Sequence, residues 1–336
     1  MAKKHFILSI DGGGIRGLIP AMVLAELEKR LAKAGKPTQL AGHFHMIAGT
    51  STGGIIAAGL TCPKTKTSKT PVCTAADLVD FYAKEGDDIF DQSFFAKLRG
   101  IFNPAGLFDE RYDAGPLEKA LKARLGNLMV SNALTTVVMT AYDITLRAAV
   151  FITNGVNKDK KPSDDFLFWE AARATSAAPT YFEPALITNF TQKRSDALID
   201  GGVFANDPAL AAVVEAKKQG WAEDDLVVVS LGTGQNIRSY AYADAKNWGA
   251  FSWVSPGNGS PILSILMHGQ ATTISYQMRS LFGTPKGRYF RIDGMLDNAS
   301  DDLDDASPQN IKNLKIEATN IIAANAASLD AIVAAL

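Results

Sequence analysis

The sequence has few cysteines and histidines, almost no net charge and no long hydrophobic run. It contains 336 residues, of which two are cysteine and four are histidine, and its formal net charge is -1. Two cysteines, Cys62 and Cys73, do not make a disulfide framework, and with no export signal we expect reduced thiols; a disulfide that closes the loop between them is the alternative. The small net charge excludes a global attraction to nucleic acid or to an anionic membrane. No apolar stretch is long enough to cross a bilayer, so we expect a cytoplasmic chain with peripheral membrane contact at most.

The chain is long enough to bury a sizeable core, and 47% of its residues are hydrophobic. The apolar run near the N-terminus, HFILSI, is too short for a signal peptide and leads into glycines, which indicates a buried first strand. We find no repeat and no linker. We therefore predict a single domain over residues 1–336, with its motifs in a core of about 6–235 and a helical C-terminal region of about 236–336 packed on that core.

The first 60 residues alternate between short apolar runs and segments with helical spacing. Strands are predicted at 5–10 and 44–49, and helices at 18–35 and from 52 onwards. This βαβα start favours a parallel sheet with helices packed on it. Further helices are predicted over 75–85, 112–125, 165–178, 261–282 and 308–335, and further strands over 135–144, 148–154, 197–200 and 225–234.

The segment Gly49-Thr50-Ser51-Thr52-Gly53 matches the G-x-S-x-G pattern of a nucleophile elbow. A strand precedes it and a helix follows, which is the context that this motif needs. The turn would project the serine oxygen at the edge of the sheet, with the positive end of the helix dipole beneath it. The alternative is a small-residue turn where a helix packs on a sheet.

A glycine-rich turn, Asp11-Gly12-Gly13-Gly14-Ile15-Arg16-Gly17, joins the first strand to the first helix. Its glycine spacing also fits a dinucleotide-binding loop. That fold requires an acidic residue at the end of the second strand, and GKPTQLAGHF at 35–44 has none. The turn therefore favours an oxyanion hole built from backbone N–H groups, with the positive charge of Arg16 beside them. An ordinary ion pair is the alternative role for Arg16.

A serine nucleophile needs a base, and two candidates remain. Three of the four histidines lie at the start of the first two predicted strands, opposite the elbow: His5, His43 and His45. Asp200 ends a predicted strand and is followed by Gly201 and Gly202, which would put its carboxylate at the same sheet edge as Ser51. His268 would complete the chain order of an α/β-hydrolase triad, but it falls inside a helical pattern. We favour a Ser51–Asp200 dyad.

Three motifs in order, DGGGIRG at 11–17, GTSTGG at 49–54 and DGG at 200–202, resemble those of the patatin-like phospholipases. The similarity extends to RATSAAPTYFEPA at 173–185 and DGGVFANDPAL at 200–210, and covers about residues 6–235. Each motif alone is weak, but the ordered set is specific. One departure is Asp207, because relatives commonly have ANNP where this chain has ANDP. The expected effect of its extra negative charge is on the pKa values nearby.

The resemblance implies a three-layer α/β/α sandwich with a mostly parallel central sheet, and a Ser–Asp dyad that needs no cofactor and no metal. The roles that it transfers are Ser51 as nucleophile, Asp200 as base, Gly12, Gly13 and Gly14 as oxyanion hole with Arg16 in support, and Gly49, Gly53, Gly201 and Gly202 as supporting motif glycines.

The expected function is hydrolysis of fatty acyl esters in phospholipids or related glycerolipids through an acyl-enzyme. The expected partners are a lipid substrate and a membrane surface, and no nucleic acid. The alternatives are an effector or toxin phospholipase that needs a protein or small-molecule activator, and a non-catalytic nucleotide-binding module of the same fold. The Phe-rich stretch 89–108 could line an acyl groove or form a satellite core. The acidic run 297–305 lacks EF-hand spacing, so no calcium requirement is expected.

Overall fold

The computed structural model describes residues 4–85, 113–155, 164–235, 239–254, 260–283 and 287–336. Within them lies an eight-stranded mixed sheet with the order β5-β6-β3-β2-β1-β7-β8, and β4 also pairs with β3. The run β3-β2-β1-β7-β8 is parallel throughout. The strands are β1 (His5–Ile10), β2 (Met46–Thr50), β3 (Thr136–Asp143), β4 (Ala148–Thr153), β5 (Ala185–Asn189), β6 (Arg194–Asp200), β7 (Leu226–Leu231) and β8 (Tyr289–Ile292).

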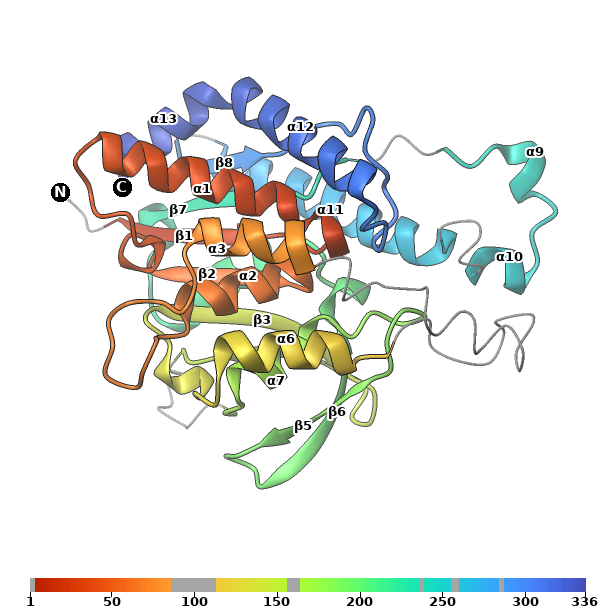
Figure 1. The fold of residues 1–336 in the computed structure, drawn as a ribbon, viewed down its shortest axis with the longest axis horizontal. Helices are drawn as coiled ribbons and strands as arrows, with labels where there is room; N and C mark the ends of the chain where they lie inside the picture. The colour runs from red at the N-terminus through yellow and green to blue at the C-terminus, as the bar shows by residue number, and fades with distance from the viewer. Residues whose placement is uncertain (1–3, 86–112, 156–163, 236–238, 255–259, 284–286) are drawn as a thin grey trace.

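Helices cover both faces of this sheet (Figure 1). They are α1 (Leu18–Lys33), α2 (Thr52–Thr61), α3 (Ala75–Asp80) with a π-helical turn (Phe81–Glu85), α6 (Gly115–Leu125), α7 (Phe168–Thr175), α8 (Ala209–Lys218), α9 (Tyr242–Ala245), α10 (Ala250–Val254), α11 (Pro261–Phe282), α12 (Pro308–Ala324) and α13 (Ala326–Ala335).

Alternating strand residues divide the core between the two faces, because successive side chains of a strand point in opposite directions. Leu8 and Ile47 pack in the large cluster with α1, α2, α7 and α12. Ile7 and Met46 pack in a smaller cluster with α8 and the C-terminal part of α11. The predicted three-layer α/β/α sandwich with a mostly parallel sheet is therefore confirmed.

The strand β6 brings its last residue to the end of β2 in a way that the sequence did not predict. Both β2 and β6 pair with β3. The last residue of β2, Thr50, pairs with Thr140, and the last residue of β6, Asp200, pairs with the next residue, Ala141. Because β4 occupies the other edge of β3 over these residues, β2 and β6 must share one edge. β2 runs parallel to β3 and β6 runs antiparallel, so their carboxyl ends meet head to head.

Most of the predicted elements are present, with differences at short or interrupted ones. The helix predicted over 261–282 is α11 with the same bounds, whereas the helix predicted over 308–335 is divided at Asn325 into α12 and α13. The strands β5 and β8 were not predicted, because both are short and β8 carries Arg291 in its centre. The Phe-rich stretch 89–108 lies outside the described residues.

Among the described residues, no single helix has the length and apolar composition that a membrane span requires. Only α12 and α13 taken together pass that test, and they are bent by 67°. No disulfide joins Cys62 and Cys73, which are both buried.

Because α2 packs closely on the sheet, a side chain at Gly53 should destabilise the fold. A Cβ atom on Gly53 would lie 2.1 Å from the carbonyl oxygen of Ile10, whereas a Cβ on Gly269 in α11 would meet nothing within 4 Å. We expect Gly53→Ala to lower the free energy of unfolding by about 3 kcal/mol or more. Gly269→Ala, the matched control, should raise it by up to about 1 kcal/mol. Urea denaturation of both variants measures this, and equal effects would contradict the packing argument.

Candidate active site

Ser51 occupies a strained backbone position between β2 and α2. Its φ of 54° and ψ of -123° are unfavourable for a serine, and such strain is typical of functional turns. A Cβ on Gly49 would lie 2.0 Å from the carbonyl oxygen of Gly53, so this turn requires glycine at position 49. The N–H of Ser51 donates to Oγ1 of Thr175 at 2.9 Å. Gly49, Gly53 and Thr175 thus fix the serine, which lines a cavity.

The carboxylate of Asp200 is buried beside Ser51, with only 2% of the residue exposed. Its Oδ1 accepts a hydrogen bond from the N–H of Gly202 at 2.7 Å. Its Oδ2 is buried and has no donor with full hydrogen-bond geometry among the described residues. Burial raises the pKa of Asp200 to about 7, and hydrogen bonding to the Ser51 hydroxyl and to Gly202 lowers it by less. A carboxylate with this pKa can exchange a proton near neutral pH.

The glycine-rich turn is held from one side by hydrogen bonds to its carbonyl oxygens. The oxygen of Gly12 accepts from Oγ1 of Thr233 at 2.8 Å. The oxygen of Gly13 accepts from the backbone N–H of Arg16 at 3.1 Å and from its Nε at 3.3 Å. In a trans peptide the N–H of the next residue points in the direction opposite to the carbonyl oxygen. These bonds therefore turn the N–H groups of Gly13 and Gly14 away from Thr233 and Arg16.

The three glycines predicted as oxyanion donors differ in their hydrogen bonding. The N–H of Gly12 already donates to the backbone oxygen of Asn206 at 3.0 Å. No hydrogen bond from the N–H of Gly13 or Gly14 is found within the described residues. Gly14 has a φ of +58°, and a Cβ there would lie 2.0 Å from the carbonyl oxygen of Leu303. Of the three predicted donors, Gly12 is thus already bonded, and the oxyanion role of Gly13 and Gly14 stays a prediction.

The side chain of Arg16 does not lie beside Ser51 and Asp200. Its Nη1 donates to the carbonyl oxygen of Gly234 at 3.3 Å, and its side chain lines a different cavity from the one that contains Ser51. Burial lowers the pKa of its guanidinium. Its contact with the turn is therefore through the carbonyl oxygen of Gly13, which it holds in place.

A buried cluster of charges lies under the turn. Arg291 makes two hydrogen bonds to Asp11, at 2.9 and 2.7 Å, and also binds Asp207 at 3.3 Å and Asp293 at 2.9 Å. Burial raises the pKa of Asp11 and of Asp207, and Arg291 opposes this rise. The extra carboxylate of Asp207 is thus paired with Arg291, and Asp207 is not among the causes of the raised pKa of Asp200.

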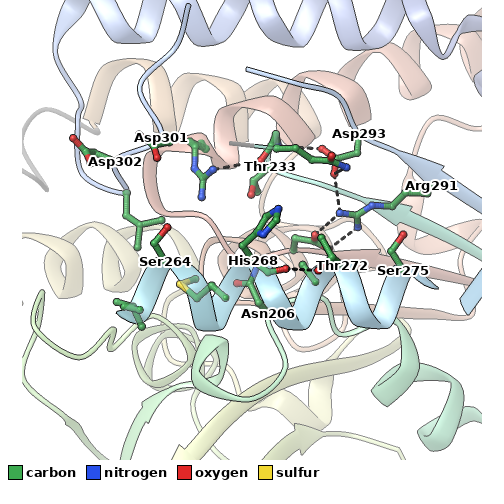
Figure 2. A pocket seen from close by; sticks show the side chains of 18 of the residues that line it. Asn206, Thr233, Ser264, His268, Thr272, Ser275, Arg291, Asp293, Asp301 and Asp302 are labelled. Atoms are coloured by element: carbon green, nitrogen blue, oxygen red, sulfur yellow. Dashed lines mark hydrogen bonds and ion pairs between the residues drawn. The ribbon is translucent and has the colours of Figure 1, made fainter. Parts of the chain in front are cut away.

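Two cavities adjoin the turn. The smaller, of about 50 Å³, contains Ser51 and Asp200, and its other walls are mainly apolar: Ile55, Phe81, Tyr82, Leu117, Ala178 and Phe182. The larger, of about 300 Å³, is lined by charged, polar and apolar residues and is shown in Figure 2. Tyr181, Met267 and Leu303 line both. The two cavities therefore lie on either side of a shared wall at the dyad.

The histidines lie away from the dyad or do not bond to it. The ring of His5 stacks on Trp221 and meets the ring of His45, at the start of β1. His268 lies on α11 and lines the larger cavity, as Figure 2 shows. In the described part of the chain, no hydrogen bond joins His268 to Ser51 or Asp200. The same described residues also contain no group of three or more His, Cys, Asp or Glu side chains that could hold a metal ion.

Three residues of the site were missed from the sequence: Thr175, Asn206 and Thr233. Thr175 lies in RATSAAPTYFEPA and Asn206 in DGGVFANDPAL, two segments that the resemblance included without giving them roles. Thr233 lies just after β7, within the strand predicted over 225–234, for which no function was predicted. Each acts through a hydrogen bond to backbone that is distant in sequence, and spacing along the chain carries no signal for such a contact.

The fold and the elbow define an α/β/α protein with a serine on a strand-to-helix turn. The family model of the patatin-like phospholipases matches residues 8–213. Patatin-like protein 2 of Oryza sativa subsp. indica is 33% identical over 93% of this chain and 82% of its own length. The chain therefore belongs to the patatin-like phospholipase family, which supports a lipid acyl hydrolase activity in general.

Membership of the family does not by itself establish that a protein is active. A protein of Solanum tuberosum named "Probable inactive patatin-3-Kuras 1" is 34% identical over 74% of this chain and 68% of its own length. The crystal structure of VipD from Legionella pneumophila matches with a TM-score of 0.38 and 11% identity, over 96% of this chain and 67% of that one, a likeness too weak to bear on function. Activity must therefore be argued from the site itself.

The raised pKa of Asp200 should make the stability of the fold depend on pH. Between pH 3.8 and about 7 the folded protein binds more protons at this group than the unfolded chain does, so stability falls as the pH rises through this window. Asp200→Asn removes the buried charge and keeps an acceptor for Gly202. We expect the variant to be more stable than the wild type at pH 8, by ~1–4 kcal/mol, and to lose this advantage towards pH 4.

Thermal or urea unfolding of both proteins at pH 4, 6 and 8 measures the difference. A stability gap that does not change with pH would mean that Asp200 has an ordinary pKa in the folded protein.

Proposed function

We propose that this chain is a carboxylic ester hydrolase that releases fatty acids from phospholipids or related glycerolipids, with Ser51 as nucleophile and Asp200 as general base. The observation that carries the proposal is the strained serine beside a buried carboxylate whose pKa is raised to about 7. A solvated aspartate with a pKa near 3.9 would be too weak a base for serine at neutral pH.

The reaction proceeds through an acyl-enzyme. Asp200 takes the hydroxyl proton as Oγ of Ser51 attacks the ester carbonyl, and the N–H groups of Gly13 and Gly14 stabilise the oxyanion. Removing one such donor typically costs about 3–4 kcal/mol of transition-state stabilisation. Asp200 then gives the proton to the leaving alcohol. A water molecule then gives a proton to Asp200 and attacks the acyl carbonyl, the bond to Oγ of Ser51 breaks, and Asp200 returns the proton to Oγ as the fatty acid leaves.

The smaller cavity suits the acyl part of the substrate next to the ester. Its apolar walls include Ile55, Phe81 and Phe182, and it contains Ser51. With a volume of about 50 Å³ it has room for only a few water-sized groups, so most of a long acyl chain must lie beyond it. The predicted groove from the stretch 89–108 stays a prediction.

Peripheral membrane contact is proposed through the exposed face of α11. Ile262, Ile265 and Leu266 are all 40–45% exposed, while Leu263 and Met267 on the opposite face line the cavities. An apolar surface beside the cavity entrance would bring the lipid ester to the dyad as the protein meets the membrane. The cytoplasmic location and the dependence on an activator stay predictions.

The dyad is tested by release of free fatty acid from mixed phospholipid vesicles. We expect Ser51→Ala and Asp200→Asn to lower kcat/KM about 1,000-fold or more, because both remove groups that act in the transition state. His268→Ala should stay within about tenfold of the wild type. Equal loss in His268→Ala would contradict the dyad and favour the triad order.

The membrane surface is tested by comparing vesicles with a water-soluble ester. Ile265→Asp should lower fatty acid release from vesicles about tenfold more than hydrolysis of p-nitrophenyl butyrate, because it introduces charge where an apolar side chain would be buried. Leu186→Asp is the matched control, since Leu186 is 73% exposed on β5, in the β5–β6 hairpin at the edge of the sheet. If both variants lose vesicle activity equally, α11 is not the contact surface.

A further inference from the structure

The segment 201–206 follows the proposed base and reaches the glycine-rich turn. At one end, the N–H of Gly202 donates to Oδ1 of Asp200 at 2.7 Å. At the other end, the backbone oxygen of Asn206 accepts from the N–H of Gly12 at 3.0 Å. A shift of this segment would therefore move both the carboxylate and the turn that carries the proposed oxyanion donors.

Hydrogen bonds within the segment and one from β2 hold part of it. The N–H groups of Phe204 and Ala205 donate to the carbonyl oxygen of Gly201, at 3.0 and 2.8 Å. The carbonyl oxygen of Ala205 accepts from Oγ1 of Thr50 at 2.6 Å. The segment is thus tied to itself and, at Ala205, to the end of β2.

The side chain of Gln270 on α11 makes two further hydrogen bonds to this segment. Its Nε2 donates to the carbonyl oxygen of Val203 at 2.7 Å, and its Oε1 accepts from the N–H of Asn206 at 3.2 Å. An amide side chain has both donors and an acceptor, so one residue can satisfy two backbone groups of opposite kind. The two backbone groups lie 67 and 64 residues away in the sequence, so these bonds join distant parts of the chain.

The helix α11 is a fixed support for Gln270, because it packs into both hydrophobic clusters of the core. Met267, one turn before Gln270, belongs to the larger cluster, and Met278 and Phe282, after it, belong to the smaller one. Met267 also packs against the segment, since a Cβ on Gly202 would lie 3.0 Å from its Cε. The core therefore sets the position from which Gln270 holds the segment.

Gln270 is separate from the groups that react. It does not line the cavity that contains Ser51 and Asp200. Within the described residues its hydrogen bonds go to Val203 and Asn206, and none goes to Ser51 or Asp200. An effect of Gln270 on the reaction must therefore pass through the segment 201–206.

We propose that Gln270 is a positioning residue for ester hydrolysis, which fixes the segment 201–206 and thereby places Asp200 beside Ser51 and holds the glycine-rich turn. The inference rests on the proposed function of Ser51 and Asp200. A misplacement of the reacting groups by about 1 Å can lower a rate about 100-fold. Two hydrogen bonds from one partly buried amide thus support the reaction without contact with the substrate.

Hydrolysis of p-nitrophenyl butyrate tests this role without a membrane. Gln270→Met keeps an unbranched side chain and loses both hydrogen bonds. It should lower kcat about 100-fold and leave KM within about threefold of the wild type. If Gln270→Met does not fold, Gln270→Glu replaces it, because its carboxylate still accepts from Asn206 and only the donor to Val203 is missing. It should also lower kcat and keep KM.

Gln277→Met is the matched control. Gln277 lies on α11 two turns after Gln270, and both residues are partly buried. Its Oε1 has no hydrogen-bond partner among the described residues, so the substitution removes no bond from that atom. The kcat of this variant should stay within about threefold of the wild type.

The pH dependence of kcat separates positioning from a loss of stability. A looser segment would admit water to the carboxylate of Asp200 and lower its pKa towards the ordinary value. The midpoint of kcat, expected near 7 in the wild type, should therefore be lower in Gln270→Met and unchanged in Gln277→Met. A variant that is only less stable would keep the midpoint of the wild type.

Equal kcat values in Gln270→Met and Gln277→Met, or a loss of kcat with an unchanged midpoint, would overturn the positioning role. In either case hydrolysis by the wild type, abolished by Ser51→Ala, would show that the proposed function still stands. A wild type without hydrolysis that depends on Ser51 would overturn the proposed function, and the positioning role with it.

Discussion

The burial of the Asp200 carboxylate beside Ser51 is the constraint on which the rest of the site depends. Burial raises the pKa of this group to about 7. The position follows from the sheet, because β2 and β6 end head to head on one edge of β3, at Thr140 and Ala141. One backbone arrangement therefore brings the two side chains together and buries the carboxylate, and burial is what the proposed role of Asp200 as a base requires.

The C-terminal part of the chain completes the site although the family model ends at residue 213. Thr233 holds the carbonyl oxygen of Gly12, Arg291 binds Asp11 at the start of the turn, and the N–H of Ile15 donates to the carbonyl oxygen of Leu303 at 2.8 Å. β8 also extends the sheet by pairing with β7. The glycine-rich turn is thus held by residues distant in sequence, and within the described residues the N–H groups of Gly13 and Gly14 make no hydrogen bond.

The sequence predicted the layers, the elbow and the pairing of Ser51 with Asp200, because these depend on local patterns and on ordered motifs. Asp200 was predicted at the same sheet edge as Ser51, and it does lie beside Ser51. The prediction did not include the antiparallel direction of β6, which is what brings the end of β6 to the end of β2. It also assigned three oxyanion donors and placed Arg16 beside them. The bond from Gly12 to Asn206 and the turn of Arg16 towards Gly234 both depend on tertiary contacts, which no spacing in the sequence encodes.

The most direct test of Asp200 as the base for Ser51 is the rate at which a fluorophosphonate labels the protein as a function of pH. Mass spectrometry identifies the modified residue. Labelling does not require the right lipid, so it reports on the serine and its base alone. If Ser51 is the nucleophile and Asp200 its base, we expect a single adduct, on Ser51. The labelling rate should rise with pH to a plateau with a midpoint near 7, and His268→Ala should have the same midpoint. Labelling at another residue, a midpoint near 4, or loss of the pH dependence in His268→Ala would contradict it.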